Sequence, residues 1–368
     1  MTRICYNNVE RIEQFMILPC PWLKLKMHQA VDRVAKRKEK TMKKRVRKIT
    51  AMILAASMVL GVSGCGKSQK STQDSGNTAK VKIAYQYGLA YAPLTIMQEQ
   101  GLIEKNYDGD IEVEWVSLNS GSAINEGMAS GDIDVACMGI APFISGVTAG
   151  IPYKMYGTIA AQPHELLTND DSIHSLKDIT DDKKISVVNI GSIQHILLAM
   201  LAKEELGDAH ALDNNLVAMS HPDGMTALMS GSVACQLTTA PYIFKAKEQD
   251  NIKEAESLDS VWPEGNAFIV GLVSDDLYEN QPEIYQAVVD ATQEAMDYIN
   301  NNQEEAANIL CQKEDVTAET MLDWMQDPGC VYDMKLPGVM DMANFMAEND
   351  FADKAPESFE AITTESAR

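Results

Sequence analysis

Arginine is nearly absent from most of this sequence. From Cys65 to the C-terminus the chain has one arginine, and it is the last residue, Arg368. Arginine holds sulfonate, phosphate and carboxylate groups through two parallel hydrogen bonds from its planar guanidinium group. The sequence therefore excludes an arginine clamp for an anion in any site formed between these two positions.

Positive charge of every kind is scarce in the same region. Residues 65–368 carry 17 basic and 49 acidic groups, a formal charge of −32, whereas residues 1–64 carry 14 basic and only 4 acidic groups. An acidic body of this kind repels nucleic acid and anionic lipid headgroups, which excludes a nucleic-acid partner. Its field also opposes the approach of an anion at low salt.

The seven cysteines form neither a disulfide framework nor a zinc site, because no CxxC occurs and their spacing is irregular. We expect the cysteines of the body to be buried small hydrophobic side chains. These are Cys137, Cys235, Cys311 and Cys330. The histidines lack the tight spacing or acidic partner of a metal site. We therefore expect no metal and no cofactor.

The N-terminal region has no apolar run that would span a bilayer comfortably. Residues 49–62 are fourteen mostly apolar or small residues, and five Lys/Arg precede them. This order is typical of a secretory signal, which would occupy residues 42–64. The alternative is an N-terminal helix that anchors the chain in a membrane. "VSGC", ending at Cys65, resembles a bacterial lipobox, so acyl chains on Cys65 would anchor the protein to a membrane. Residues 65–79 predict a flexible tether. Residues 1–41 carry nine Lys/Arg and no secretory pattern. We therefore expect them to be a doubtful leader, with translation starting at Met42.

Strand, turn and helix alternate through the body and then repeat. Three such units start at residue 80, and three more follow in the same order from residue 183. "SGDIDVACMGIAPFI" (130–144) is nearly repeated as "SGSVACQLTTAPYI" (230–243), and Gly88, Gly131 and Pro142 recur at close to constant offset. This pattern predicts an α/β fold with two Rossmann-like lobes, each a parallel sheet with helical crossovers.

The turns that follow the strands are the candidate site, because ligands bind outside the carboxyl ends of strands in such sheets. They occupy residues 87–93, 119–122 and 139–142 in the first lobe and 189–195, 220–224 and 238–241 in the second. Gly and Ser there let backbone N–H groups approach a ligand at helix N-termini; the alternative is that they only shape tight turns. The candidate ligand-binding residues are Tyr87, Gly88, Tyr91, Ser120, Gly121, Ser122, Gly139, Ile140, Ala141, Asn189, Gly191, Ser192, Gln194, His195, His221, Thr238 and Thr239.

Several segments resemble one family in the same order. They are "GLAYAPLTIMQEQGLIE", "ASGDIDVACMGIAPFISGVTAGIP", "GSIQHILL", "ALMSGSVACQLTTAPY" and "NQPEIYQAVVDATQEAMDYINNNQEEAANIL". The family is that of the substrate-binding lipoproteins of ABC importers for nitrate, sulfonate and taurine, which have the type II periplasmic-binding fold. The resemblance implies a first lobe of residues 80–165 and 270–368, a second lobe of 166–269, and a ligand cleft between them. The chain crosses between the lobes near 160–180 and 262–272.

The resemblance also implies a function: a monomeric solute-binding component, lipid-anchored at the extracytoplasmic face of a bacterial cell membrane, that delivers a small-molecule solute to ABC permease subunits. The residues leave the solute open. Without arginine, a sulfonate would depend on helix N-termini and hydroxyl groups. Aromatic side chains near the turns suit a neutral, zwitterionic or cationic ring compound, and the resemblance to the superfamily implies a heteroaromatic vitamin precursor such as a thiamine pyrimidine as the alternative. An enzyme on the same fold and a surface sensor or adhesin are further alternatives, but no catalytic Ser/His/Asp or Cys/His set stands out.

Overall fold

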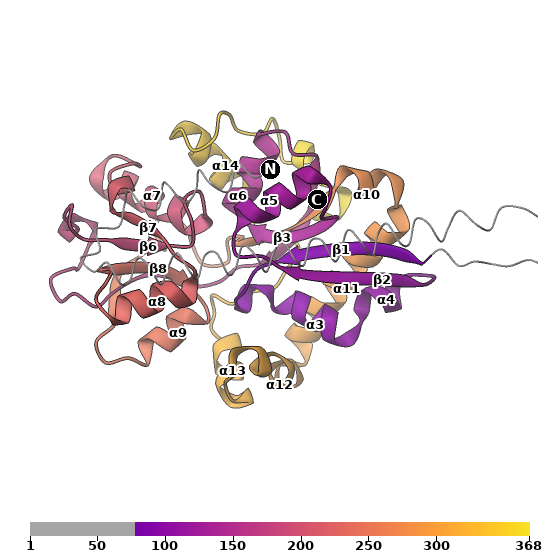
Figure 1. The fold of residues 1–368 in the computed structure, drawn as a ribbon, viewed down its shortest axis with the longest axis horizontal. Coiled ribbons are helices and arrows are strands. Elements are labelled where there is room, and N and C mark those ends of the chain that lie inside the picture. The colour runs from indigo at the N-terminus through magenta and orange to yellow at the C-terminus, as the bar shows by residue number, and fades with distance from the viewer. Residues whose placement is uncertain (1–77) are drawn as a thin grey trace, which may run out of the picture. The chain divides into compact units, whose positions relative to one another are not determined.

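The computed structural model describes residues 78–368. The expected leader, the signal, the acylated Cys65 and nearly all of the tether lie outside the described residues. Within them the fold consists of two five-stranded sheets with helices around each (Figure 1). No helix in residues 78–368 is both long enough and apolar enough to cross a membrane.

The first sheet has the strand order β2-β1-β3-β10-β4. Strands β1 and β2 pair in parallel and so do β1 and β3, whereas β10 is antiparallel to both β3 and β4. The strands are β1 (Ala79–Tyr85), β2 (Ile111–Ser117), β3 (Val135–Gly139), β4 (Tyr153–Ala160) and β10 (Ile269–Ser274).

The second sheet repeats this plan in the order β7-β6-β8-β5-β9. Strand β6 is parallel to β7 and β8, and β5 is antiparallel to β8 and β9. The strands are β5 (His164–Thr168), β6 (Ile185–Val187), β7 (Leu216–Ala218), β8 (Cys235–Thr239) and β9 (Lys253–Ser257). The near-copies in the sequence are thus β3 and β8, the central strands of the two sheets.

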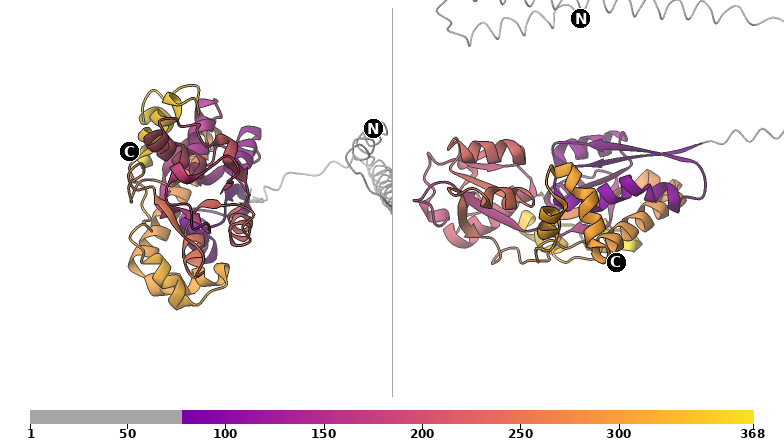
Figure 2. Two further views of the ribbon diagram at one scale, coloured as in Figure 1. Left: turned by 90° about the vertical axis from the view of Figure 1, so that its left-hand side faces the viewer. Right: turned by 90° about the horizontal axis from the view of Figure 1, so that it is seen from below.

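The prediction of purely parallel sheets is wrong, because each sheet contains one strand that the chain supplies after crossing from the other. The chain leaves the first sheet at β4 and enters the second at β5, so this crossing lies at residues 161–163, just before the boundary expected at 165. It returns after β9 through residues 258–268 into β10. A strand that arrives from the opposite sheet runs against its neighbours. Seen from below in Figure 2, residues 164–257 form one block and the remaining described residues another.

Local signals in the sequence account for the helix starts and stops. Ser120, Ser192 and Ser220 are N-caps whose hydroxyl oxygens accept a hydrogen bond from the backbone N–H three residues later. Gly101 and Gly131 end their helices in the left-handed conformation that glycine adopts without steric cost. In the first lobe these helices are α3 (Ala92–Gln100), α4 (Leu102–Asn106), α5 (Gly121–Ser130) and α6 (Ile140–Thr148). In the second lobe they are α7 (Ile193–Leu206), α8 (His221–Met229) and α9 (Tyr242–Lys247).

The C-terminal helices follow the return to the first sheet. They are α10 (Asp275–Asn280), α11 (Pro282–Asn301), α12 (Gln303–Glu314), α13 (Ala318–Met325) and α14 (Val339–Glu348). Short 3₁₀ turns are η1 (Leu89–Tyr91), η2 (Leu176–Asp178), η3 (Asp213–Asn215), η4 (Glu360–Ile362) and η5 (Glu365–Ala367). Helices α12 and α13 also contact the second lobe. The Lys245 ammonium group of α9 lies 2.7 Å from the Glu314 carboxylate, and Phe244 stacks on Trp324 at 5.8 Å.

The four described cysteines are free. Cys137 in β3 and Cys235 in β8 are fully buried, as expected, and burial raises the pKa of the two thiols to about 12 and about 11. Cys311 and Cys330 are half-buried. The two buried thiols are therefore packing groups at ordinary pH, because the reactive thiolate form is disfavoured.

Candidate functional site

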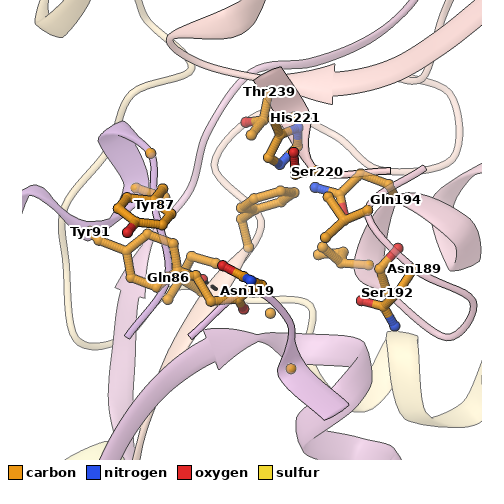
Figure 3. Close-up of a pocket in the computed structure, with 18 of the residues that line it drawn as sticks. Gln86, Tyr87, Tyr91, Asn119, Asn189, Ser192, Gln194, Ser220, His221 and Thr239 are labelled. Atoms are coloured by element: carbon orange, nitrogen blue, oxygen red, sulfur yellow. Dashed lines mark hydrogen bonds between the residues drawn. The ribbon is translucent and has the colours of Figure 1, made fainter. Parts of the chain in front are cut away.

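A cavity of about 70 Å³ lies between the two sheets, where their central strands end (Figure 3). Its first-lobe wall is formed by the turn after β1, the start of α5 and the junction of β3 with α6. Its second-lobe wall is formed by the turns before α7 and α8 and by the junction of β8 with α9. Phe268 and Ile269, at the return crossing, complete the lining.

The structure brings ten of the sequence-predicted residues to this cavity. They are Tyr87, Gly88, Tyr91, Gly121, Gly139, Asn189, Ser192, Gln194, His221 and Thr239. The other seven do not line it: Ser120, Ser122, Ile140, Ala141, Gly191, His195 and Thr238. Each of the six predicted turns thus contributes at least one residue to the cavity lining, while the other predicted residues of these turns contact neighbouring residues instead.

The residues that do not line the cavity have other partners. Ile140 and Ala141 are fully buried in the first turn of α6. The Ser120 hydroxyl accepts the Ala123 N–H as a helix cap. Ser122 Oγ lies 3.5 Å from Asn189 Nδ2, a contact between the two lobes at the edge of the cavity. Gly191, His195 and Thr238 support residues that do line the cavity, as described below.

Several lining residues are absent from the predicted set. Gln86, Asn119 and Tyr242 lie in or next to the expected turns, so a scan of every polar or aromatic side chain near those turns would have found them. Phe268 is different, because it belongs to the segment between β9 and β10 and has no counterpart in the repeat. Only the tertiary structure places it against the cavity.

Aromatic rings form much of the lining. Tyr91 is 6% exposed, and its hydroxyl donates to Gln86 Oε1 at 3.2 Å. On the opposite wall the rings of His221 and Tyr242 stack at 5.1 Å with 13° between their planes. Tyr87 is 65% exposed and is one of the few large apolar side chains of the described residues that face solvent. These rings offer flat surfaces to a planar ligand.

His221 is uncharged at ordinary pH. Its ring lies beside Tyr242, and burial lowers the pKa of the imidazole to about 4. Nδ1 lies 2.8 Å from the hydroxyl of Thr238, a fully buried residue of β8. Thr238 therefore acts on the cavity through His221, which explains why it does not line the cavity itself.

The described lining contains no Asp, Glu, Lys or Arg. Its polar groups are amides, hydroxyls and the neutral imidazole. Three helices, α5, α7 and α8, begin beside the cavity and direct the partial positive charge of their N-termini towards it. The site is therefore electrically neutral with a weak preference for ligand atoms that accept hydrogen bonds.

No metal centre is built into this lining. Among the described residues no group of three His, Cys, Asp or Glu side chains is placed to hold a metal ion. Within the cavity His221 is the one lining residue of a metal-ligating type, and its Nδ1 contacts Thr238.

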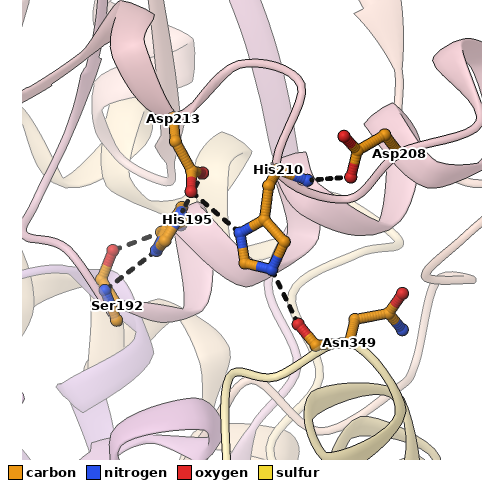
Figure 4. Close-up of polar contacts among 7 residues, drawn as sticks. Ser192, His195, Asp208, His210, Asp213 and Asn349 are labelled. Carbon is orange, nitrogen blue, oxygen red and sulfur yellow. Dashed lines mark hydrogen bonds and ion pairs between the residues drawn. The ribbon is translucent and has the colours of Figure 1, made fainter.

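His195, one of the predicted ligand-binding residues, does not line the cavity. It occupies the first turn of α7 and is 4% exposed. Figure 4 shows its ring between the start of α7 and Asp213. Ser192, Ile193 and Gln194 line the cavity, whereas the His195 ring contacts the Gly191 N–H and the Asp213 carboxylate instead.

Comparisons with known proteins identify relatives of this chain. The sequence model of the NMT1-like family matches residues 74–312. A protein of Brachyspira hyodysenteriae named as an ABC transporter periplasmic binding protein is 26% identical over 289 residues, which cover 73% of this chain and 78% of that protein.

Two solved structures show the fold. The periplasmic aliphatic sulphonate binding protein of Escherichia coli has a TM-score of 0.62 at 18% identity, over 78% of this chain and 99% of that chain. The periplasmic nitrate-binding protein of Synechocystis PCC 6803 has a TM-score of 0.54 at 17% identity, over 67% of this chain and 70% of that chain. These likenesses confirm the expected periplasmic-binding-protein fold.

Proposed function

Since this chain belongs to the NMT1-like family, we propose that it is the extracytoplasmic solute-binding component of an ABC importer. The observation that carries this proposal is the cavity between two lobes of equal plan, lined from both sides by turns at the carboxyl ends of strands. Two lobes joined by two crossings can close on a solute and reopen. The solute would then pass to a permease.

The first candidate solute is a sulfonate, taurine or nitrate, because two structural neighbours are named for sulphonate and nitrate. In this chain such an anion would be held only by helix N-termini, amides and hydroxyls. The second candidate is an uncharged planar compound, such as the heteroaromatic vitamin precursor that the sequence suggests. The uncharged lining and the stacked His221–Tyr242 pair favour this second candidate.

The solute can be tested directly. Native mass spectrometry of protein purified from its own host would detect a co-purified small molecule. A thermal-shift screen would then compare sulfonates and nitrate with pyrimidine-like amines. Stabilisation by the amines supports the uncharged solute, stabilisation by the anions alone contradicts it, and the absence of any bound or stabilising solute contradicts the proposed function.

A pair of variants assigns the binding to this cavity. Tyr242→Leu removes one ring of the stacked pair and should weaken binding of an aromatic solute about two- to tenfold. Tyr107→Leu removes a half-buried tyrosine that follows α4, packs on the core and does not line the cavity, and it should leave the affinity unchanged. Equal affinities for the two variants would place the solute elsewhere.

Membrane attachment is a separate part of the proposal, and it depends on Cys65 in the sequence "VSGC". Two or more acyl chains on one cysteine would give stable anchoring without a spanning helix. Labelling cells with palmitate should mark the wild-type protein and not the Cys65→Ala variant. Equal labelling of both would contradict anchoring at this residue, and the intact mass of the unprocessed precursor would show whether translation starts at Met42.

A further inference from the structure

The turn that carries Asn189 and Ser192 to the cavity is held from behind by His195. Gly191 has a φ of 81°, and its N–H donates to Nδ1 of His195 at 3.0 Å. The His195 N–H donates in turn to Ser192 Oγ at 3.3 Å. Because Nδ1 accepts a backbone N–H, the proton of the neutral imidazole must be on Nε2, and burial lowers the pKa of this histidine.

Nε2 of His195 faces a carboxylate that a second histidine shares. Asp213 Oδ1 lies 3.4 Å from His195 Nε2, and Asp213 Oδ2 lies 2.8 Å from His210 Nδ1. The other nitrogen of His210, Nε2, lies 2.8 Å from the backbone oxygen of Asn349 (Figure 4). His195 and His210 belong to the second lobe, whereas Asn349 follows α14 of the first lobe.

The two partners of His210 determine its charge. A carboxylate and a backbone carbonyl only accept hydrogen bonds, so both ring nitrogens of His210 must donate. Only the imidazolium form carries a proton on both nitrogens. The contact between the lobes at this point therefore requires positively charged His210.

The groups around His210 favour that charge. Asp213 contacts its ring, and Asp208 accepts its backbone N–H at 3.0 Å. Neutral His195, which belongs to α7, contacts the other oxygen of the same Asp213 carboxylate. From the segment after α14, His210 meets the Asn349 carbonyl and the Phe351 ring, centred 4.5 Å away, with Asp350 between them in the chain. The hydrogen bonds to Asp213 and Asn349 and the nearby carboxylates raise the pKa of His210.

We propose that His195 is a positioning residue for the second-lobe wall of the cavity, and that doubly protonated His210 fastens this wall to the first lobe. The fastening is complete below the ordinary histidine pKa and is lost as pH rises through the raised pKa of His210. The lobes are thus held together more firmly at acid than at alkaline pH. The inference depends on the proposed function only in treating the cavity as the solute site.

The first measurement is nitrogen NMR of the full chain with ¹⁵N-labelled histidine, which has six imidazole groups to assign. We expect His210 to be protonated on both nitrogens at pH near 6.5, and His195 to be neutral with its proton on Nε2. Asp213→Asn should lower the pKa of His210. A neutral His210 at pH near 6.5, or an unchanged pKa in the variant, overturns the proposal.

The second measurement is hydrogen exchange in the segment after α14. The N–H groups of Phe351 and Ala352 donate to the Met346 carbonyl and report on its order. Relative to wild type, His210→Gln should speed their exchange about two- to fivefold at acid pH, the range of a partly exposed ion pair, and should have no effect at alkaline pH. His174→Gln replaces an exposed histidine outside the network and should have no effect at either pH.

If His210→Gln has no effect on exchange, or the same effect at both pH values, the proposal that His210 fastens the two lobes (the clasp) is refuted. His210 is 40% exposed, so the variant should fold, and a matching unfolding midpoint would verify this. Neither measurement needs a solute. A chain that binds no solute would still show the clasp, and a chain without the clasp would still bind a solute in the cavity, so the two proposals fail separately.

Discussion

The contribution of His221 to stability should fall as pH falls from neutral to mildly acid values, because the folded state keeps this imidazole uncharged. Burial lowers the pKa of this imidazole from 6.5 to about 4. Over that interval the unfolded chain binds a proton that the folded chain does not. The contribution of His221 to the free energy of unfolding therefore decreases as pH decreases, and it is present in full only above the ordinary pKa.

The size of the effect follows from the same shift. A pKa that moves from 6.5 to about 4 removes about 2 kcal/mol from the free energy of unfolding between about pH 7.5 and pH 5, and about 3 kcal/mol below pH 4. His195 and His164 also have lowered pKa values, that of His210 is raised, and burial raises the pKa of Glu256 to about 7, so the pH dependence of the wild type is a sum of opposing contributions. A variant is needed to isolate His221.

Urea unfolding of the wild type and of His221→Gln at the two pH values provides the assay. The glutamine has no proton to gain, so the wild type should lose about 2 kcal/mol more than the variant on acidification. His174→Gln, at an exposed position, should lose as much as the wild type. If the stability difference between wild type and His221→Gln is the same at both pH values, His221 does not have a lowered pKa, and the argument for a neutral cavity loses one of its supports.

Two further predictions follow from contacts in and near the site. Gly146→Ala should destabilise the protein by about 1–3 kcal/mol, because the added Cβ would lie 1.8 Å from the Tyr153 hydroxyl. In a thermal unfolding assay, Tyr153→Phe in the same background should recover part of this loss. No recovery would mean that another contact is responsible. Thr239→Val should weaken solute binding more than Ile140→Val, since Thr239 lines the cavity and Ile140 does not; titration of the co-purified solute into both variants checks this, and equal affinities would contradict it.

The two-lobe organisation could be predicted because it is repeated along the chain. Glycines such as Gly131 and serine caps such as Ser192 act within a few residues, so strand–turn–helix units are visible locally. The near-identity of residues 130–144 and 230–243 then identifies corresponding strands. The rule that ligands bind at the carboxyl ends of strands selected turns that meet at the cavity, and ten of the predicted residues line it.

The direction of strands β10 and β5 could not be predicted in the same way. Their local sequence is that of a buried strand in either direction, and the antiparallel pairing arises because each follows a crossing from the other sheet. The position of Phe268 in the cavity lining depends on the same crossing. Pairings of this kind join residues 67 to 138 positions apart, and no local preference encodes them.

The sequence by itself determined that this protein has two similar α/β lobes, that its candidate site lies in the turns of both, and that no arginine can serve that site. These properties depend on composition and on short-range backbone preferences. The tertiary structure decided which atoms of the turns meet the cavity. It turned Ser192 towards the cavity and His195 away from it, placed Thr238 behind His221, and brought His210 to Asn349. The physical reason is that side-chain direction at the start of a helix is fixed by how that helix packs on its sheet, and that contacts between lobes exist only once both have folded.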